Sequence, residues 1–170
     1  MIVEALAMEL DHAVKQTHTL LERLPEDRLG WRPHPKAYSL GQLALHLGQI
    51  PSIVSAFVAQ DVSQFPTERN QAEAGSRAEA ARTLDEGHAN AKAALARMSD
   101  AALSTPWKLE RDGQELMTVP RMVLFREFLL NHFYHHRGQL TTYLRTLDVP
   151  LPSTYGPTAD VDPFAAPAAT

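Results

Sequence analysis

Three of the eight histidines in this chain lie within five consecutive positions, in the stretch NHFYHHRGQL at residues 131–140. Imidazole nitrogens bind Zn²⁺ and other divalent transition metals, so such a cluster raises the question of a metal site. His132 and His136 are four residues apart, which places both side chains on one face of a helix, one turn apart. His135 lies about 100° away, on the flank of that face, and we do not expect it to be a ligand.

The apolar pattern around this stretch predicts that His132 and His136 face the core of the protein. Phe125, Leu129 and Tyr143 share the same face of the predicted helix. A buried polar group without a partner costs about 1–3 kcal/mol, and a shared metal ion would satisfy both rings at once. The simpler alternative is that each ring is hydrogen-bonded to a neighbour and no metal binds.

A third ligand has to come from another helix, and His46 is the best candidate. It lies at the edge of the apolar face of the predicted second helix, where the interior of a bundle would begin. Gln42 and Gln49 flank His46 on the same side and are candidates to support it. His88, on the apolar face of the predicted third helix, is the competing candidate. We interpret it instead as a core histidine that is hydrogen-bonded to a neighbour.

Four segments with apolar residues at helical spacing must position these histidines. Ser39 is a natural N-cap for the second segment, and Ser76 with Glu79 predicts a capping box at the start of the third. Four helices of this length are typical of a four-helix bundle, so we predict an all-α fold. The segments are about 2–24, 39–57, 76–98 and 118–147, and the predicted bundle domain covers residues 1–148.

The segments between the predicted helices are informative as well. Residues 60–76 are polar and without pattern, which predicts a long connection between the second and third helices. Pro51 predicts a kink or a local break in the second helix. The step Asp112-Gly113 indicates a small hairpin or a structured loop. Residues 149–170 are rich in Pro and Ala and are expected to form an extended tail.

Composition excludes several classes of function. The chain has 170 residues, a net charge of -4 and no cysteine, so disulfides, thiolate ligands and a cysteine nucleophile are excluded. Lys and Arg are scattered, which gives no indication of nucleic-acid binding. The apolar runs are too short for a membrane span, and the N-terminus lacks the basic region of a secretory signal. We therefore expect a cytoplasmic protein.

Two stretches resemble the DinB/YfiT-like family of metal-binding four-helix bundles. They are SLGQLALHLGQI at residues 39–50 and HFYHHRGQLTTYLR at residues 132–145, and the resemblance extends from the first helix to Leu147. It implies that His46, His132 and His136 bind one divalent metal ion, and that the chain forms a homodimer. Zinc, nickel, manganese and iron all suit such ligands.

The resemblance also implies a chemistry. Some members of the family are thiol S-transferases that use low-molecular-weight thiols such as bacillithiol or mycothiol. We prefer this activity, in which the thiol is added to a small-molecule substrate. A metal-bound thiol loses its proton and becomes a nucleophile. One alternative is a metal-dependent hydrolase, in which bound water has its pKa lowered to about 7. Another is a bundle without enzymatic activity whose metal is structural.

Four further residues of the last helix belong to the same stretch. We expect Gln139 to orient a ligand and Gly138 to permit close packing of helices. Arg137 is expected to form an ion pair or to contact a second copy of the chain. Tyr143 either lines a pocket or is an aromatic residue of the core.

Overall fold

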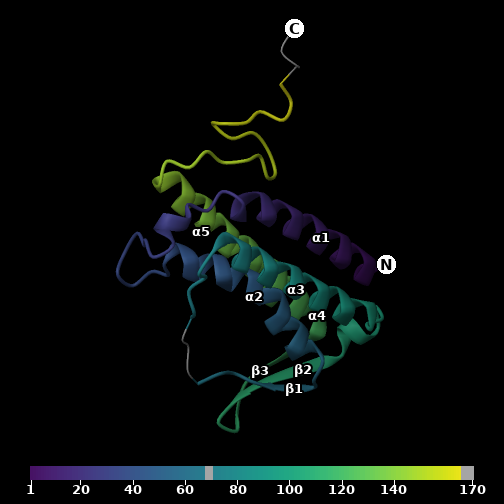
Figure 1. Ribbon diagram of the computed structural model, residues 1–170. Helices are drawn as coiled ribbons and strands as arrows, with labels where there is room; N and C mark the ends of the chain where they lie inside the picture. Colours follow the sequence, from purple (N-terminus) through teal and green to yellow (C-terminus); the bar gives the residue numbers. More distant parts are fainter. Residues whose placement is uncertain (68–70, 166–170) are drawn as a thin grey trace.

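The computed structural model describes residues 1–67 and 71–165, and this part of the chain forms four long helices with a small sheet at one end (Figure 1). Three of the helices are α1 (Ile2–Leu21), α2 (Leu40–Val58) and α3 (Arg77–Ala96). The fourth is continuous but changes type, with α4 (Arg121–Val123), a π-helical segment (Leu124–Asn131) and α5 (His132–Thr146). Short 3₁₀ turns lie at Glu26–Arg28 and Ala102–Ser104. Across the described residues, no helix combines the length and the hydropathy that a membrane span requires.

The start of α2 is fixed by a complete capping box. The Ser39 hydroxyl accepts from the backbone N–H of Gln42 at 3.1 Å, and the Gln42 side chain accepts from the backbone N–H of Ser39 at 2.9 Å. At the start of α3, Ser76 accepts from the N–H of Glu79, but the Glu79 carboxylate accepts from Gly75 instead of Ser76. The helix α2 continues through Pro51 without a break.

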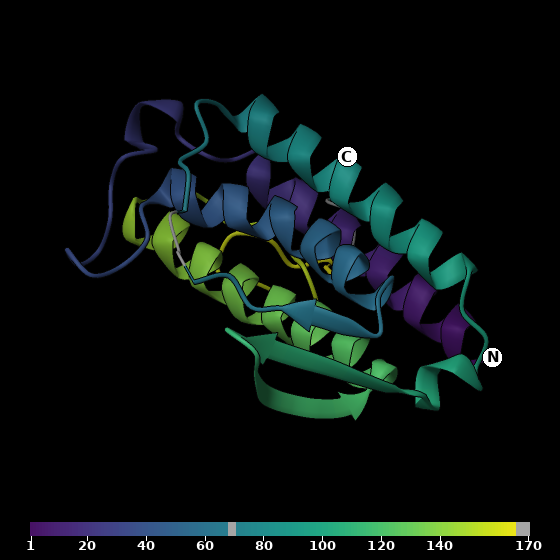
Figure 2. The ribbon, with the colours of Figure 1, turned by 90° about the horizontal axis from the view of Figure 1, so that it is seen from below.

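The connection between α2 and α3 lets these two helices run parallel. It returns the chain along the length of α2 before α3 begins (Figure 2). Near the start of both helices, the N–H of Ala74 donates to the Gly41 carbonyl at 3.3 Å. Further along, Asn90 Nδ2 donates to the Ser52 hydroxyl at 3.1 Å. The helix α5 crosses α2 in the opposite direction, so residues early in α2 lie beside residues late in the chain.

A three-stranded sheet lies at the end of the helices, so the prediction of an all-α fold is wrong. Its order is β1-β2-β3, with β1 parallel to β2 and β2 antiparallel to β3. The hairpin between β2 and β3 turns at Asp112 and Gly113, which both have positive φ. The strand β1 has only one buried side chain, the polar Ser63. It therefore lacks the alternation of apolar and polar residues by which a strand is predicted from sequence. The strands are β1 (Val62–Gln64), β2 (Pro106–Arg111) and β3 (Gln114–Pro120).

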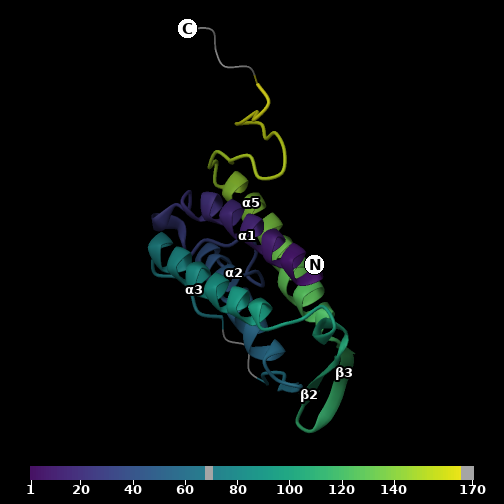
Figure 3. The same cartoon turned by 90° about the vertical axis from the view of Figure 1, so that its right-hand side faces the viewer.

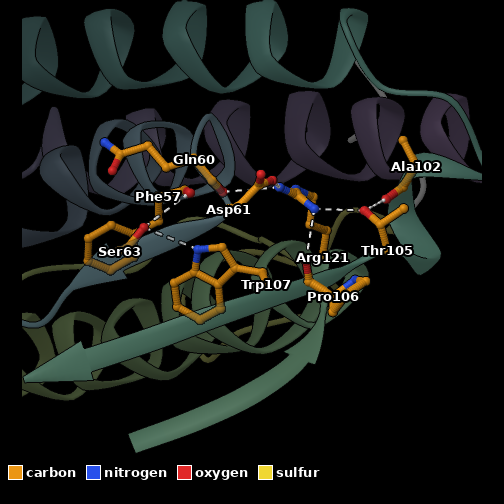
Figure 4. Close-up of polar contacts among 9 residues, drawn as sticks. All are labelled: Phe57, Gln60, Asp61, Ser63, Ala102, Thr105, Pro106, Trp107 and Arg121. Atoms are coloured by element: carbon orange, nitrogen blue, oxygen red, sulfur yellow. Dashed lines mark hydrogen bonds and ion pairs between the residues drawn. The ribbon is translucent and has the colours of Figure 1, made fainter. Parts of the chain in front are cut away.

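Trp107 joins this sheet to the helices. Its side chain is 1% exposed and packs between Phe57 of α2 and Phe128 of the π-helical segment, with ring centroids 5.9 and 6.2 Å away. Its indole N–H donates to the Ser63 hydroxyl at 3.1 Å, which links β2 to β1 (Figure 4). The apolar body and the polar tip of this residue are therefore both satisfied.

Arg121 makes a second junction at the same end of the molecule. It is 9% exposed, and its guanidinium donates to the Thr105 hydroxyl at 2.7 Å and to the Pro106 carbonyl at 3.0 Å (Figure 4). It also donates to the Gln60 carbonyl at 3.1 Å and pairs with Asp61. One side chain thus holds together the end of α2, the start of β2 and the start of the last helix.

The chain after α5 first lies against the helices, and its last described part runs away from them (Figure 3). Its first residues stay close, because Val149 and Leu151 pack on the core and Arg23 donates to the Pro150 carbonyl at 3.1 Å. Asp160 then pairs with Arg145 of α5. The division of the chain into a domain and a tail at residue 148 stays a prediction.

Candidate metal centre

Three imidazoles from two helices converge beside the core. His46 comes from α2, and His132 and His136 come from α5. One nitrogen of each ring lies within 4.8 Å of the other two, and the Nε2 atoms of His132 and His136 are 2.8 Å apart. All three residues are half-buried. The structure therefore brings together the three predicted ligands.

The direction of the two α5 histidines differs from the prediction. The side of α5 that faces the core carries Phe133, Arg137 and Leu140, whereas His132 and His136 lie beside that stripe. The π-helical segment Leu124–Asn131 ends one residue before His132. A π-turn holds more residues than an α-turn, so it advances the buried face by one position relative to a regular helix.

A hydrogen-bond acceptor holds each imidazole on its other side. Gln71 Oε1 lies 3.1 Å from His46 Nδ1, and Gln139 Oε1 lies 2.7 Å from His136 Nδ1. The backbone carbonyl of Phe128 accepts from the His132 ring. An amide oxygen or a carbonyl only accepts, so the ring nitrogen that faces it carries the proton. The Nε2 atoms of His46 and His136 are then free to bind a metal.

Burial keeps these rings neutral at physiological pH. Desolvation, assisted by the charge of His132 and opposed by the bond to Gln71, lowers the pKa of His46 to about 4. Desolvation likewise lowers the pKa of His136 to about 4, assisted by the neighbouring histidines and opposed by the bond to Gln139. The pKa of His132 is lowered for the same main reason. Neutral imidazole is the form that binds a metal ion.

Gln71 was missed by the sequence analysis. It lies in the polar connection between α2 and α3, where no periodic pattern marks any residue. Its Nε2 donates to Gln49 Oε1 at 3.0 Å, and its backbone carbonyl accepts from Gln42 Nε2 at 2.8 Å. The two glutamines predicted to flank His46 therefore act on Gln71, which in turn contacts the histidine.

Aromatic residues form the rim of the cluster. The Tyr38 ring lies 5.7 Å from His46 and 6.5 Å from His136, measured between centroids. Tyr143 is half-buried, packs edge-on against Trp31 at 5.5 Å and donates its hydroxyl proton to the Tyr38 carbonyl at 3.2 Å. Tyr143 therefore positions the loop that carries Tyr38.

Other candidates lie outside the cluster. His135 is exposed, and His88 is bonded to Asp11 at 2.6 Å, as predicted for a histidine with a neighbouring partner. Among the described residues, no carboxylate joins the three imidazoles.

Arg137 and Gly138 differ from what the sequence indicated. Arg137 is 5% exposed and donates to the Ala13 carbonyl at 3.3 Å, between the rings of Tyr134 and Tyr155. Its contacts within the described chain are thus a hydrogen bond and two aromatic faces instead of an ion pair, and contact with a second copy stays a prediction. A Cβ on Gly138 would meet no atom within 4 Å, so this glycine permits no close packing within the described chain.

Comparison with known proteins identifies the family of the chain and supports its fold. The family model of the DinB superfamily matches residues 9–140. A DinB-like protein from Bacillus cereus superposes with a TM-score of 0.71 at 21% identity, over 89% of this chain and 97% of the other. A DinB-like protein from Bacillus subtilis gives a TM-score of 0.67 at 16% identity, over 88% and 97%. No curated protein sequence is a significant match to the chain. The match to the family model covers most of the sequence, and the chain belongs to the DinB superfamily.

Proposed function

We propose that His46, His132 and His136 hold one divalent metal ion, and that the protein uses it to transfer a low-molecular-weight thiol to an electrophilic small molecule. The observation that carries the proposal is the convergence of three neutral imidazoles from two helices within 4.8 Å. Metal–nitrogen bonds of about 2.0–2.1 Å in a tetrahedral site place two ligand nitrogens roughly 3.3 Å apart. In the cluster, the Nε2 atoms of His132 and His136 are 2.8 Å apart, and no two of the ligand nitrogens are more than 4.8 Å apart, which is compatible with that value.

The ligand set favours an anionic nucleophile. All three ligands are neutral, and the groups that support them are two side-chain amides and one backbone carbonyl. The full charge of a divalent ion would therefore remain available at its open position. A metal ion held by the three histidines would lower the pKa of a thiol or water bound at that open position and so make it a nucleophile towards the electrophile.

The residues of the chain itself favour a thiol supplied from outside. The sequence contains no cysteine, so an enzyme-borne thiolate is excluded. No carboxylate of the described residues stands in the cluster to act as a general base towards water. In the transfer, the thiolate sulfur forms a bond to an electrophilic carbon, and the leaving group departs with the bonding electron pair. The thiol proton goes to solvent.

Metal reconstitution followed by two parallel assays tests this proposal. The chain loaded with Zn²⁺, Ni²⁺, Mn²⁺ or Fe²⁺ is given an aryl halide with a low-molecular-weight thiol, and separately an activated ester without thiol. We expect metal-dependent thioether formation that chelation abolishes. Ester hydrolysis alone would favour the hydrolase, and folding that depends on the metal with neither activity would favour a structural ion. A His136→Ala variant with full metal content and activity would refute the site.

A further inference from the structure

Two of the three histidines are supported from within their own helix, but His46 is not. His132 bonds to the Phe128 carbonyl four residues earlier, and His136 bonds to Gln139 three residues later. The partner of His46 is Gln71, which is 25 positions away and lies in the connection between α2 and α3. The orientation of this one ring therefore depends on a segment outside the two helices that carry the cluster.

Every polar atom of the Gln71 amide is used in a way that fixes its direction. Oε1 accepts from the His46 ring at 3.1 Å. Nε2 donates to Gln49 Oε1 at 3.0 Å and to the Ala72 carbonyl at 3.1 Å. Turning the amide over would place Oε1 against Gln49 Oε1 and the Ala72 carbonyl, which are both acceptors, and would lose these two bonds. The amide oxygen, and not the nitrogen, consequently faces His46.

The backbone of Gln71 is held from the same helix face. Gln42 Nε2 donates to the Gln71 carbonyl at 2.8 Å. Gln42 itself is fixed because its Oε1 accepts from the Ser39 backbone in the capping box. Gln42, His46 and Gln49 are spaced by four and three residues, so they share one face of α2. Both glutamines thus hold Gln71, one by its backbone and one by its side chain.

We propose that Gln71 is a positioning residue of this centre, which fixes His46 as the tautomer protonated on Nδ1 and so presents Nε2 to the metal. The inference rests on the proposed metal site for its function. The tautomer itself, however, is a property of the protein before any metal is added. Gln71 touches the ligand and acts only through it.

Imidazole ¹⁵N NMR of the metal-free full chain at pH 8 measures the tautomer directly. In the unaltered protein His46 is expected to be protonated on Nδ1. In Gln71→Leu we expect His46 to populate both tautomers, as an imidazole without a hydrogen-bond partner does, with the Nε2–H form well populated. Gln71→Asn, which keeps an amide but is too short to reach, should behave like Gln71→Leu. The matched control is Gln64→Leu, since Gln64 lies in β1 and bonds to Glu110 instead.

Zn²⁺ affinity, measured by competition with a chromophoric chelator, supplies the second readout. Loss of a supporting group lowers metal affinity by about 10–100-fold, so Gln71→Leu should fall in this range and Gln64→Leu should not change. Gln71→Glu keeps an acceptor and should bind at least as tightly as the unaltered chain. Circular dichroism of each metal-free variant establishes that it is folded.

Separate results overturn the two proposals. An unchanged His46 tautomer in folded Gln71→Leu or Gln71→Asn, or a Zn²⁺ affinity equal to that of Gln64→Leu, would overturn the role of Gln71 while leaving the metal site intact. Zn²⁺ binding that survives His136→Ala would instead overturn the metal site, whatever the tautomer shows.

Discussion

The Nε2 atoms of His132 and His136 lie 2.8 Å apart although the N–H of each ring is directed elsewhere. The Nδ1–H of His136 donates to Gln139 Oε1, and the His132 ring donates to the Phe128 carbonyl. A neutral imidazole has only one N–H, so two lone pairs face each other across this distance. A proton between them is disfavoured, because burial lowers the pKa of both rings. A divalent cation bound by both nitrogens would remove this repulsion.

Zinc should therefore stabilise the folded protein. A ligand that binds only the native state at 100 times its Kd adds about 2.7 kcal/mol to the free energy of unfolding. Urea unfolding with and without Zn²⁺ measures this gain. His136→Ala should lose it, with a fall in affinity of more than about 100-fold. His135→Ala is the control, since His135 is the exposed neighbour; a similar loss in that variant would contradict the assignment.

The stability of the metal-free protein should decrease in mild acid. The pKa of His46 and of His136 is about 4 in the folded chain, against 6.5 in the unfolded one. Between these values the unfolded chain binds more protons than the folded chain. The contribution of the two histidines to the free energy of unfolding is therefore at its full value above pH 6.5 and decreases as the pH drops towards 4. Urea unfolding at intervals from pH 8 to 4.5 measures the slope. His136→Ala should have a shallower slope, and an equal one would show that this imidazole is not buried in its neutral form.

The sequence predicted the cluster because helical spacing alone relates His132 to His136, and because His46 lies at the edge of an apolar stripe. It could not reveal Gln71, whose place depends on the path of a polar connection. The π-helical segment was equally hidden. Its residues LFREFLLN have apolar spacing that also suits a regular α-helix, and only packing decides between the two. The strand β1 owes its existence to pairing with β2 and not to its own pattern.

The sheet should depend strongly on Trp107. Removing a fully buried large aromatic side chain costs about 3–5 kcal/mol, and here the hydrogen bond to Ser63 is lost as well. Trp107→Ala should therefore lower the free energy of unfolding by about that amount. Trp107→Phe keeps most of the packing and should cost less. Leu116→Ala on β3 is the control, because Leu116 is 45% exposed and its loss should change stability by less than about 0.5 kcal/mol.

Two glycines in helices should respond in opposite directions to the same substitution. A Cβ on Gly87 of α3 would lie 2.5 Å from the Gly48 carbonyl of α2, so the backbones of two helices would have to move apart. Such overpacking costs about 1–3 kcal/mol. A Cβ on Gly138 of α5 meets nothing within 4 Å, and alanine is favoured over glycine in a helix by about 0.5–1 kcal/mol.

Gly87→Ala should thus lower the free energy of unfolding, and Gly138→Ala should raise it, in urea titrations of dilute protein. The second variant also tests whether another molecule occupies the exposed side of α5. If Gly138→Ala destabilises the protein at high concentration but not at low concentration, a second copy packs there and the added methyl group obstructs it. If it stabilises the protein equally at both, the glycine is not needed for contact with another copy.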